Sequence, residues 1–136
     1  MPIVAGGRTA AADGPTDPAD PAQHEAHSDS RGTVVPAPVR TPRTLATAGD
    51  LLRALAAPVR IAIVLQLRES SRCVHDLVDA LGVTQPLISQ HLRVLKSAGV
   101  VRGDRHGREV VYSLVDDHLA HIVVDAVEHA EEEGGR

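Results

Sequence analysis

The sequence predicts a mainly α-helical domain that carries one β-hairpin and follows an N-terminal segment without a fold of its own. Apolar residues recur at helical spacing from Leu45 onward. Two β-rich runs flank a polar, glycine-bearing turn within residues 100–114, which is typical of a hairpin. A chain of 136 residues with one such stretch is long enough for a single modest core.

The first 43 residues are rich in Pro, Ala, Gly and small polar residues and poor in large apolar ones. Such a segment cannot bury enough apolar surface to offset the entropy lost on folding. Prolines that interrupt any helix recur along it, among them Pro15, Pro18, Pro21, Pro36, Pro38 and Pro42. We therefore expect a disordered arm over 1–43, a folded domain over 44–133 and a short tail over 134–136.

Four helices are expected before the hairpin. The first ends before Pro58, and the second begins there and runs to about Glu69, with apolar residues nearly all round. A third helix over 74–81 ends at a glycine, and a fourth follows Thr84 as N-cap and reaches about residue 98. The hairpin comes next, and Asp116 to Glu133 form an amphipathic last helix. This order of elements is that of a winged helix-turn-helix.

Composition excludes several classes of protein. The chain has no Phe or Trp and one Tyr, which disfavours stacking on single-stranded nucleic acid, and its single cysteine excludes an internal disulfide. No signal peptide or long apolar run is present, so we expect a cytoplasmic protein that does not contact membranes. Residues 84–108 hold five basic residues and one acidic residue, whereas 116–136 hold seven acidic residues and one arginine. This distribution fits a protein that meets DNA phosphates on one side and a cation on the other.

The fourth helix has the residue pattern of a DNA-reading helix. Ile88, Leu92 and Leu95 share one face, and short polar and basic residues occupy the other. Glutamine can pair with adenine, and arginine with guanine or a phosphate. Cations also cluster at the hairpin tip, the shape of a wing on the DNA backbone. The predicted DNA-binding residues are Gln85, Ser89, Gln90, Arg93, Lys96, Arg105, His106 and Arg108. His91 is expected to be a structural or phosphate contact.

The last helix carries two pairs of metal-ligating residues, Asp116 with His118 and His129 with Glu132. The two histidines share a face but are separated by about 16 Å along the axis at 1.5 Å per residue. One ion with bonds of about 2 Å cannot reach both pairs, so a second, antiparallel copy of the helix has to complete each site. Two imidazoles and two carboxylates suit Zn²⁺, with Co²⁺ or Ni²⁺ as alternatives.

The chain resembles the ArsR/SmtB family of metal-responsive bacterial repressors over about residues 45–133. The similarity lies in residues 52–60, 73–77 (Cys-Val-His-Asp-Leu), 85–92 and 105–112, and in the last helix. Its pattern of Asp-x-His followed by His-x-x-Glu looks like the zinc-sensor signature of that family. The resemblance implies a homodimer, joined through terminal helices, that binds double-stranded operator DNA and releases it on binding metal. No small-molecule substrate or enzymatic activity is implied.

The resemblance also leaves alternatives open. A second metal site is similar to Cys73 and Asp76, but the chain has His75 where thiol-rich members have a second cysteine, and His24 or His27 would have to replace missing ligands. A nickel or cobalt sensor would recruit further histidines. A metal-independent, redox-responsive repressor would act through Cys73. A zinc hydrolase is disfavoured because four protein ligands leave no open position for water.

Overall fold

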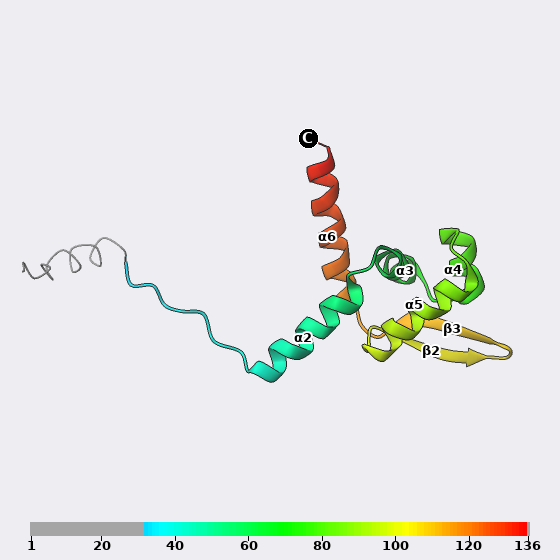
Figure 1. Cartoon of the computed structure of the whole chain (residues 1–136), viewed down its shortest axis with the longest axis horizontal. Coiled ribbons are helices and arrows are strands. Elements are labelled where there is room, and N and C mark those ends of the chain that lie inside the picture. The colour runs from blue at the N-terminus through cyan, green and yellow to red at the C-terminus, as the bar shows by residue number, and fades with distance from the viewer. Residues whose placement is uncertain (1–31, 136) are drawn as a thin grey trace, which may run out of the picture. The chain divides into compact units, whose positions relative to one another are not determined.

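The computed structural model describes residues 32–135 and divides the chain into two units, Met1–Val39 and Arg40–Arg136. In the first unit, residues 32–39 are exposed and form neither helix nor strand. The second unit contains every helix and strand of the described residues (Figure 1). Five helices and a small sheet make up this unit, in the order predicted from the sequence with one strand added.

Helix α2 spans Pro42–Leu55 and begins inside the segment for which we predicted no helix. Pro42 lies in its first turn, where the missing N–H has no intrahelical partner in any case. The Thr41 side chain accepts a hydrogen bond of 3.1 Å from the backbone N–H of Thr44 and caps the helix. Treating Pro42 as a helix breaker was therefore wrong, because a proline stops a helix from the interior and not from its first turn.

The three helices α3 (Pro58–Glu69), α4 (Val74–Leu81) and α5 (Gln85–Ser97) build the core, as predicted. Ile63 and Val64 of α3 are fully buried, which confirms that this helix is central. Leu77 of α4 is equally buried. Gly82 ends α4 with a φ of 65°, a left-handed conformation that glycine adopts without strain. The core is aliphatic throughout the described residues.

The hairpin consists of β2 (Val101–His106) and β3 (Glu109–Leu114), which pair antiparallel around a turn at Gly107. A third strand that we did not predict, β1 (Arg72–Cys73), adds to the other edge of β3, so the sheet order is β1-β3-β2. Two residues are too few to show strand alternation in a sequence. This extra strand ties the start of α4 to the hairpin.

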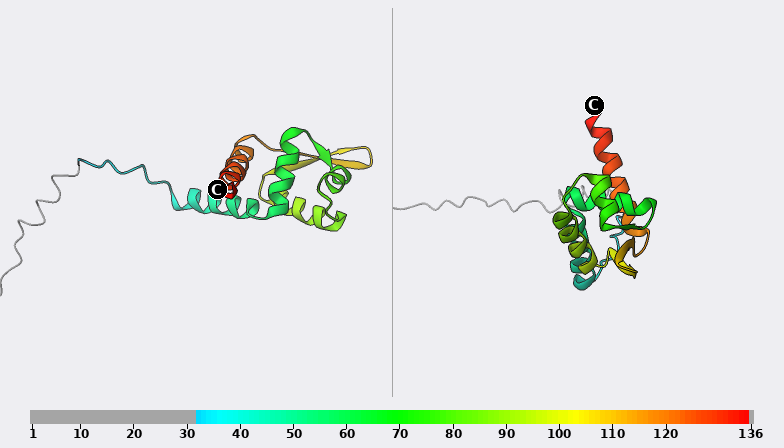
Figure 2. Two further views of the ribbon diagram at one scale, coloured as in Figure 1. Left: turned by 90° about the horizontal axis from the view of Figure 1, so that it is seen from above. Right: turned by 90° about the vertical axis from the view of Figure 1, so that its right-hand side faces the viewer.

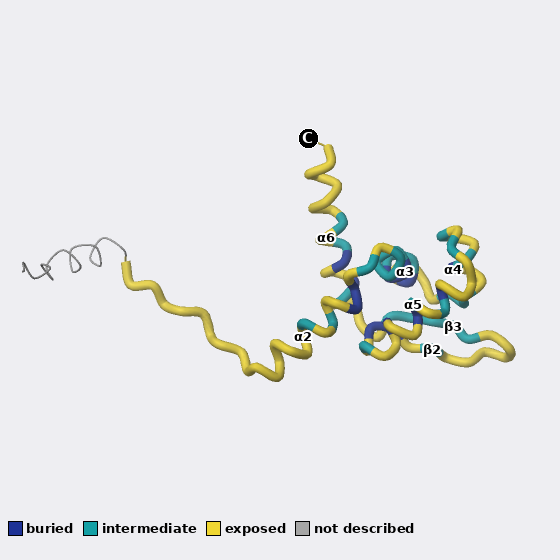
Figure 3. The backbone as a smooth tube through the Cα atoms, in the orientation of Figure 1, coloured by how far each residue is buried: buried dark blue, intermediate teal, exposed yellow. Residues whose placement is uncertain are grey.

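The last helix, α6, spans His118–Gly134 and packs on α3. It begins two residues later than predicted, so Asp116 precedes the helix, and Asp117 occupies the N-cap position. Only Ala120 and Val123 of α6 are buried. Figure 1 and the right-hand view of Figure 2 show its C-terminal half standing away from the other elements of this unit. Figure 3 shows the same half as exposed, in contrast to the buried stretches of α3 and α5.

Candidate functional site

Helix α5 presents the two faces predicted from its sequence. Ile88, Leu92 and Leu95 are 0%, 1% and 0% exposed and fix the helix against the core. The predicted DNA-facing side chains lie on the outer side. Gln85, Gln90, Arg93 and Lys96 are exposed, and Ser89 is half-buried. The polar face of α5 is therefore free to enter a groove, while its apolar face holds it rigidly in place.

The hairpin tip carries Arg105, His106 and Arg108, all of them exposed. Arg102, further down β2, lies 3.7 Å from the carboxylate of Asp104. No ion pair to Arg105 or Arg108 is found within residues 32–135. The two tip arginines thus keep their charge available for phosphates, and Arg102 is partly neutralised by its neighbour.

Gly103 of β2 pairs with Tyr112 of β3 in the hairpin. A Cβ atom on Gly103 would lie 2.9 Å from Cγ1 of Val110 and 3.1 Å from Cε1 of Tyr112. Real Cβ atoms do not approach other atoms this closely, so the glycine permits the tyrosine ring to lie over β2. This contact was not predicted from the sequence.

The four predicted metal ligands fall into two separate pairs at the two ends of α6. The backbone N–H of His118 donates to Oδ1 of Asp116 at 2.9 Å, and the His118 ring nitrogen Nδ1 lies 3.6 Å from the same oxygen. At the other end, Nε2 of His129 lies 3.9 Å from a carboxylate oxygen of Glu133, a neighbour that we did not predict. Glu132 is also exposed there.

No three metal-ligating side chains come together anywhere in the part of the chain that the structure describes. Each end of α6 therefore offers an incomplete set of donors. The side chains of both pairs project into solvent, with His118 92% and His129 74% exposed. The imidazole and carboxylate groups fit a borderline cation such as Zn²⁺, provided that the missing donors come from another molecule.

The residues of the second predicted metal site are engaged in capping α4. The backbone N–H of Cys73 donates to Oδ2 of Asp76 at 3.1 Å, and the Cys73 side chain accepts from the backbone of residue 76. These hydrogen bonds to Cys73 hold the pKa of Asp76 below its ordinary value. His75 is exposed beside them, and the predicted partners His24 and His27 lie outside the described residues. A metal at this site would have to displace the cap.

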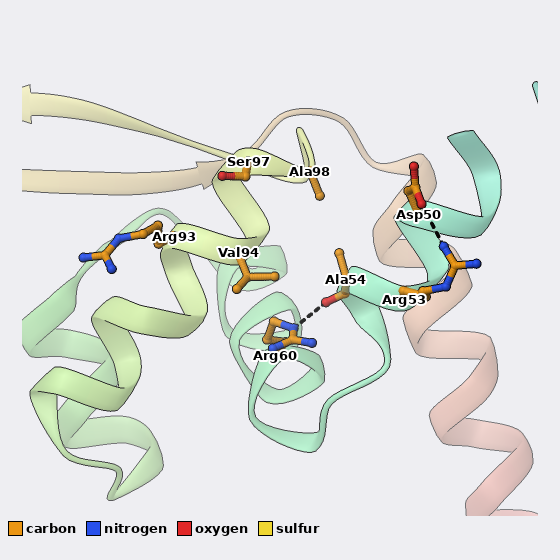
Figure 4. A pocket seen from close by; sticks show the side chains of 8 residues that line it. All are labelled: Asp50, Arg53, Ala54, Arg60, Arg93, Val94, Ser97 and Ala98. Atoms are coloured by element: carbon orange, nitrogen blue, oxygen red, sulfur yellow. Dashed lines mark hydrogen bonds and ion pairs between the residues drawn. The ribbon is translucent and has the colours of Figure 1, made fainter. Parts of the chain in front are cut away.

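His91 contacts a residue that the sequence analysis did not single out. Nη1 of Arg60 lies 3.1 Å from Nδ1 of His91, and Nε of Arg60 donates to the backbone carbonyl of Ala54. Figure 4 shows Arg60 turned toward Ala54 at one side of a pocket between α2, α3 and α5, with Arg53 paired to Asp50 and Arg93 directed away. His91 thus makes a structural contact, and the phosphate contact also expected for it stays a prediction.

Known proteins share both the sequence and this arrangement of elements. Residues 57–102 match the model of the bacterial regulatory protein arsR family. The HTH-type transcriptional repressor SmtB of Mycobacterium tuberculosis is 67% identical over 112 residues, which cover 82% of each chain. This chain belongs to the ArsR/SmtB family. It is accordingly a transcriptional repressor with a DNA-binding winged helix-turn-helix and not an enzyme.

Further members of the ArsR/SmtB family and their solved structures agree with this assignment. NmtR of M. tuberculosis is 45% identical over 86 residues, which cover 63% of this chain and 72% of NmtR. The solution structure of apo-NmtR superimposes with a TM-score of 0.57 at 40% identity and covers 75% of this chain and 86% of that one.

The homodimeric winged helix-turn-helix domain Mb0332 of Mycobacterium bovis superimposes with a TM-score of 0.62 at 25% identity. The alignment covers 74% of this chain and 93% of that domain. Among the described residues, no helix is both long and apolar enough to cross a membrane. The mainly helical fold class predicted from the sequence is confirmed by these structures.

Proposed function

We propose that the protein is a zinc-responsive repressor whose binding to operator DNA weakens when Zn²⁺ binds between the α6 helices of a homodimer. The observation that carries this proposal is the division of the metal-ligating residues into two exposed pairs at opposite ends of α6. Neither pair finds a third donor within residues 32–135. A second copy of the chain supplies the missing donors most economically, because it carries the complementary pair.

The dimer that meets this requirement has its two α6 helices antiparallel. Asp116 and His118 of one copy then lie beside His129 and Glu132 of the other, and twofold symmetry creates two equivalent sites. Because α6 buries only Ala120 and Val123 in a single chain, it has an apolar face left for a partner, and Ile122 remains 44% exposed. Val127 is half-buried further along the helix.

The ligand set favours zinc on chemical grounds. Two neutral imidazoles and two carboxylates satisfy a tetrahedral ion, and Zn²⁺ imposes no other geometry. Co²⁺ accepts the same ligands, and Ni²⁺ requires additional ones. When bound, the ion would bridge the acidic C-terminal turn of one α6 and the start of the other, where Asp116 and Asp117 carry charge of the same sign. Metal therefore acts on how the two copies are held together.

DNA binding is assigned to α5 and the hairpin tip. The polar face of α5 would read bases in the major groove, and Arg105 and Arg108 would contact the backbone. In a dimer, the two recognition helices have to match successive turns of DNA, about 34 Å apart. An ion that changes the relation of the two α6 helices changes that spacing.

Thermodynamic linkage sets the size of the response. If Zn²⁺ binds better to the conformation that fits DNA poorly, DNA lowers zinc affinity by the same factor by which zinc lowers DNA affinity. Couplings in allosteric proteins amount to about 1 to 3 kcal/mol, so we expect operator affinity to fall between about 5-fold and 150-fold.

The test is fluorescence anisotropy of the apoprotein on a labelled DNA duplex from upstream of its own gene, titrated with Zn²⁺ and then with a chelator. Wild type should release DNA with zinc and rebind it with the chelator, and His129→Ala should bind DNA normally but ignore zinc. His121→Ala is the matched control, since His121 is exposed on the same helix but outside the ligand set.

Three further measurements separate the alternatives. Repeating the titration with Co²⁺ and Ni²⁺ ranks the metals by the release that each produces. Cys73→Ser should leave zinc-driven release intact, whereas a repressor that responds through this thiol would lose its response. Operator binding that zinc leaves unchanged in wild type and in His129→Ala alike would overturn the metal-responsive mechanism.

A further inference from the structure

One side chain links three helices of the domain. Arg60 lies half-buried in the first turn of α3, and its guanidinium spans from the end of α2 to the middle of α5. Nε donates to the carbonyl of Ala54, and Nη1 lies 3.1 Å from Nδ1 of His91, 31 positions further along the chain. Figure 4 shows the first of these bonds among the side chains that line the pocket between the helices.

The Arg60 contact fixes the hydrogen on the imidazole of His91. A guanidinium has five N–H donors and no acceptor, so the Nδ1 atom it contacts has to accept. A neutral ring with an accepting Nδ1 carries its hydrogen on Nε2. The protonated ring, which donates from both nitrogens, cannot form this contact. Arg60 thus selects one tautomer of His91 and one orientation of its ring.

His91 lies next to the predicted DNA-reading face of α5, so its tautomer decides which hydrogen-bonding group is available there. His91 follows Gln90 on α5, between the buried residues of that helix and its exposed polar face, and is itself half-buried. Since Nδ1 accepts from Arg60, Nε2–H is the polar group of the ring that remains for another partner. It is a neutral donor beside the predicted DNA-reading residues.

The contact to Ala54 anchors the other end of the link. The carbonyl groups in the last turn of a helix have no intrahelical partner, and Arg60 satisfies one of them at the end of α2. Helix α2 shares an apolar hollow with α6, lined by Leu52, Leu55, Ile122 and Val123. The recognition helix is therefore tied through Arg60 to α2, which lines this hollow together with α6.

We propose that Arg60 is a positioning residue for operator binding. It holds His91 with its hydrogen on Nε2, from which the ring donates a hydrogen bond to a DNA phosphate, and it sets the orientation of α5 relative to α2. Arg60 itself does not contact DNA in this scheme. The inference rests on the proposed DNA-binding role of α5 and is independent of which metal binds at α6.

The first test is long-range ¹H–¹⁵N NMR of the histidine rings in the apoprotein at mildly alkaline pH, where imidazoles are neutral. His91→Asn identifies the His91 signals by their loss. In wild type, Nδ1 should show the shift of an unprotonated nitrogen and Nε2 that of a protonated one. Arg60→Lys keeps the positive charge but loses the planar guanidinium that contacts Ala54 and His91 together, so the His91 ring should populate both neutral tautomers. Arg68→Lys, at the exposed end of the same helix, is the control.

The second test is operator affinity as a function of salt. Asn keeps an acceptor near the position of Nδ1 but has no donor at Nε2, so His91→Asn should bind the upstream duplex about tenfold more weakly. Arg60→Lys should lose a similar factor, and the double variant should lose little more than either one alone. The salt dependence should remain that of wild type, because the ring contributes no charge.

A protonated Nδ1 in wild type, or His91 signals that do not change in Arg60→Lys, would overturn the assignment without DNA or metal being involved. Unchanged affinity of His91→Asn, with normal binding by wild type, would overturn the phosphate contact. If Arg60→Lys fails to fold, the ring signals of wild type and the affinity of His91→Asn still decide the matter. Loss of zinc-driven release in wild type would overturn the proposed metal response alone.

Discussion

The recognition helix α5 and the terminal helix α6 have similar lengths but opposite relations to the rest of the chain. Helix α5 buries Ile88, Leu92 and Leu95 completely, and every part of its predicted DNA face belongs to one molecule. Helix α6 buries only Ala120 and Val123 and carries its metal-ligating residues in two incomplete pairs. A single chain therefore contains the whole predicted DNA-binding face of α5, but it does not contain a complete predicted metal site on α6.

The residues that fix the fold lie mainly in helices such as α5, whereas the candidate regulatory residues lie on α6. A helix fixed by a filled core holds its side chains at constant positions, as a reading surface has to. A helix with few buried residues moves at little energetic cost. In the proposed mechanism, the helix that binds the metal is accordingly the less constrained one, and changes in the two helices should have different consequences.

The largest effect on stability should come from Leu92→Ala. The side chain is 1% exposed and lies in the central cluster, so its truncation should cost about 2 to 5 kcal/mol of unfolding free energy. Val94→Ala, on the outer side of the same helix and 38% exposed, should cost less than about 0.5 kcal/mol. Urea unfolding followed by circular dichroism measures both. Equal losses would contradict the contrast drawn for α5.

Ile122→Asp should separate assembly from folding. Ile122 is 44% exposed in one chain and lies by the hollow formed with α2, so a carboxylate there stays solvated in a monomer but is buried in the proposed dimer. We expect a folded monomer that has lost its zinc response, with operator affinity reduced at least tenfold. Sedimentation equilibrium measures the assembly state. A variant that remains dimeric would contradict the role of this face.

Arg105→Ala and Arg102→Ala should differ on the DNA side. Arg105 keeps its charge available at the hairpin tip, while Arg102 is partly neutralised by Asp104. A plot of log affinity against log salt concentration has a negative slope, and removing one phosphate contact makes this slope shallower by about 0.9. Arg105→Ala should show this change, and Arg102→Ala a smaller one. Anisotropy titrations at several salt concentrations measure the slopes, and identical slopes would count against the wing as a backbone contact.

The smallest effect should be that of Asp76→Asn. Hydrogen bonds from Cys73 hold the pKa of Asp76 below its ordinary value, so the ionised carboxylate stabilises the fold at neutral pH. Because the folded pKa is the lower one, this contribution is present above the unfolded pKa and is lost as pH falls through the folded pKa. The variant should melt slightly below wild type at neutral pH, and the difference should vanish in acid. Thermal unfolding across this range measures it.

Much of this fold follows from local signals in the sequence. The spacing of Ile88, Leu92 and Leu95 predicted the buried face of α5, and Gly82 predicted the end of α4, because both depend on near neighbours. Strand β1 depends on pairing with Tyr112 and Val111, which are about 40 positions away, and leaves no local pattern. The link from Arg60 to His91 is equally remote in sequence.

The sequence singled out the four candidate metal ligands, whose role stays a prediction, but it did not show how these side chains are placed. The start of α6 after Asp116 rather than at it depends on the hydrogen bond from the His118 N–H to that carboxylate, a local bond that competes with helical structure at Asp116. The proximity of Glu133 to His129 also follows from side-chain placement, since residues three and four positions away are both within reach on a helix.

Tyr112 gives the protein a built-in optical reporter. With no Trp in the chain, ultraviolet-excited emission arises from this one tyrosine, whose ring lies against Gly103 in the hairpin. Zn²⁺ has a filled d shell and does not absorb there, so a change in emission on adding zinc would report that an event at α6 has reached the wing. The native, unlabelled protein can therefore reveal whether its two ends communicate.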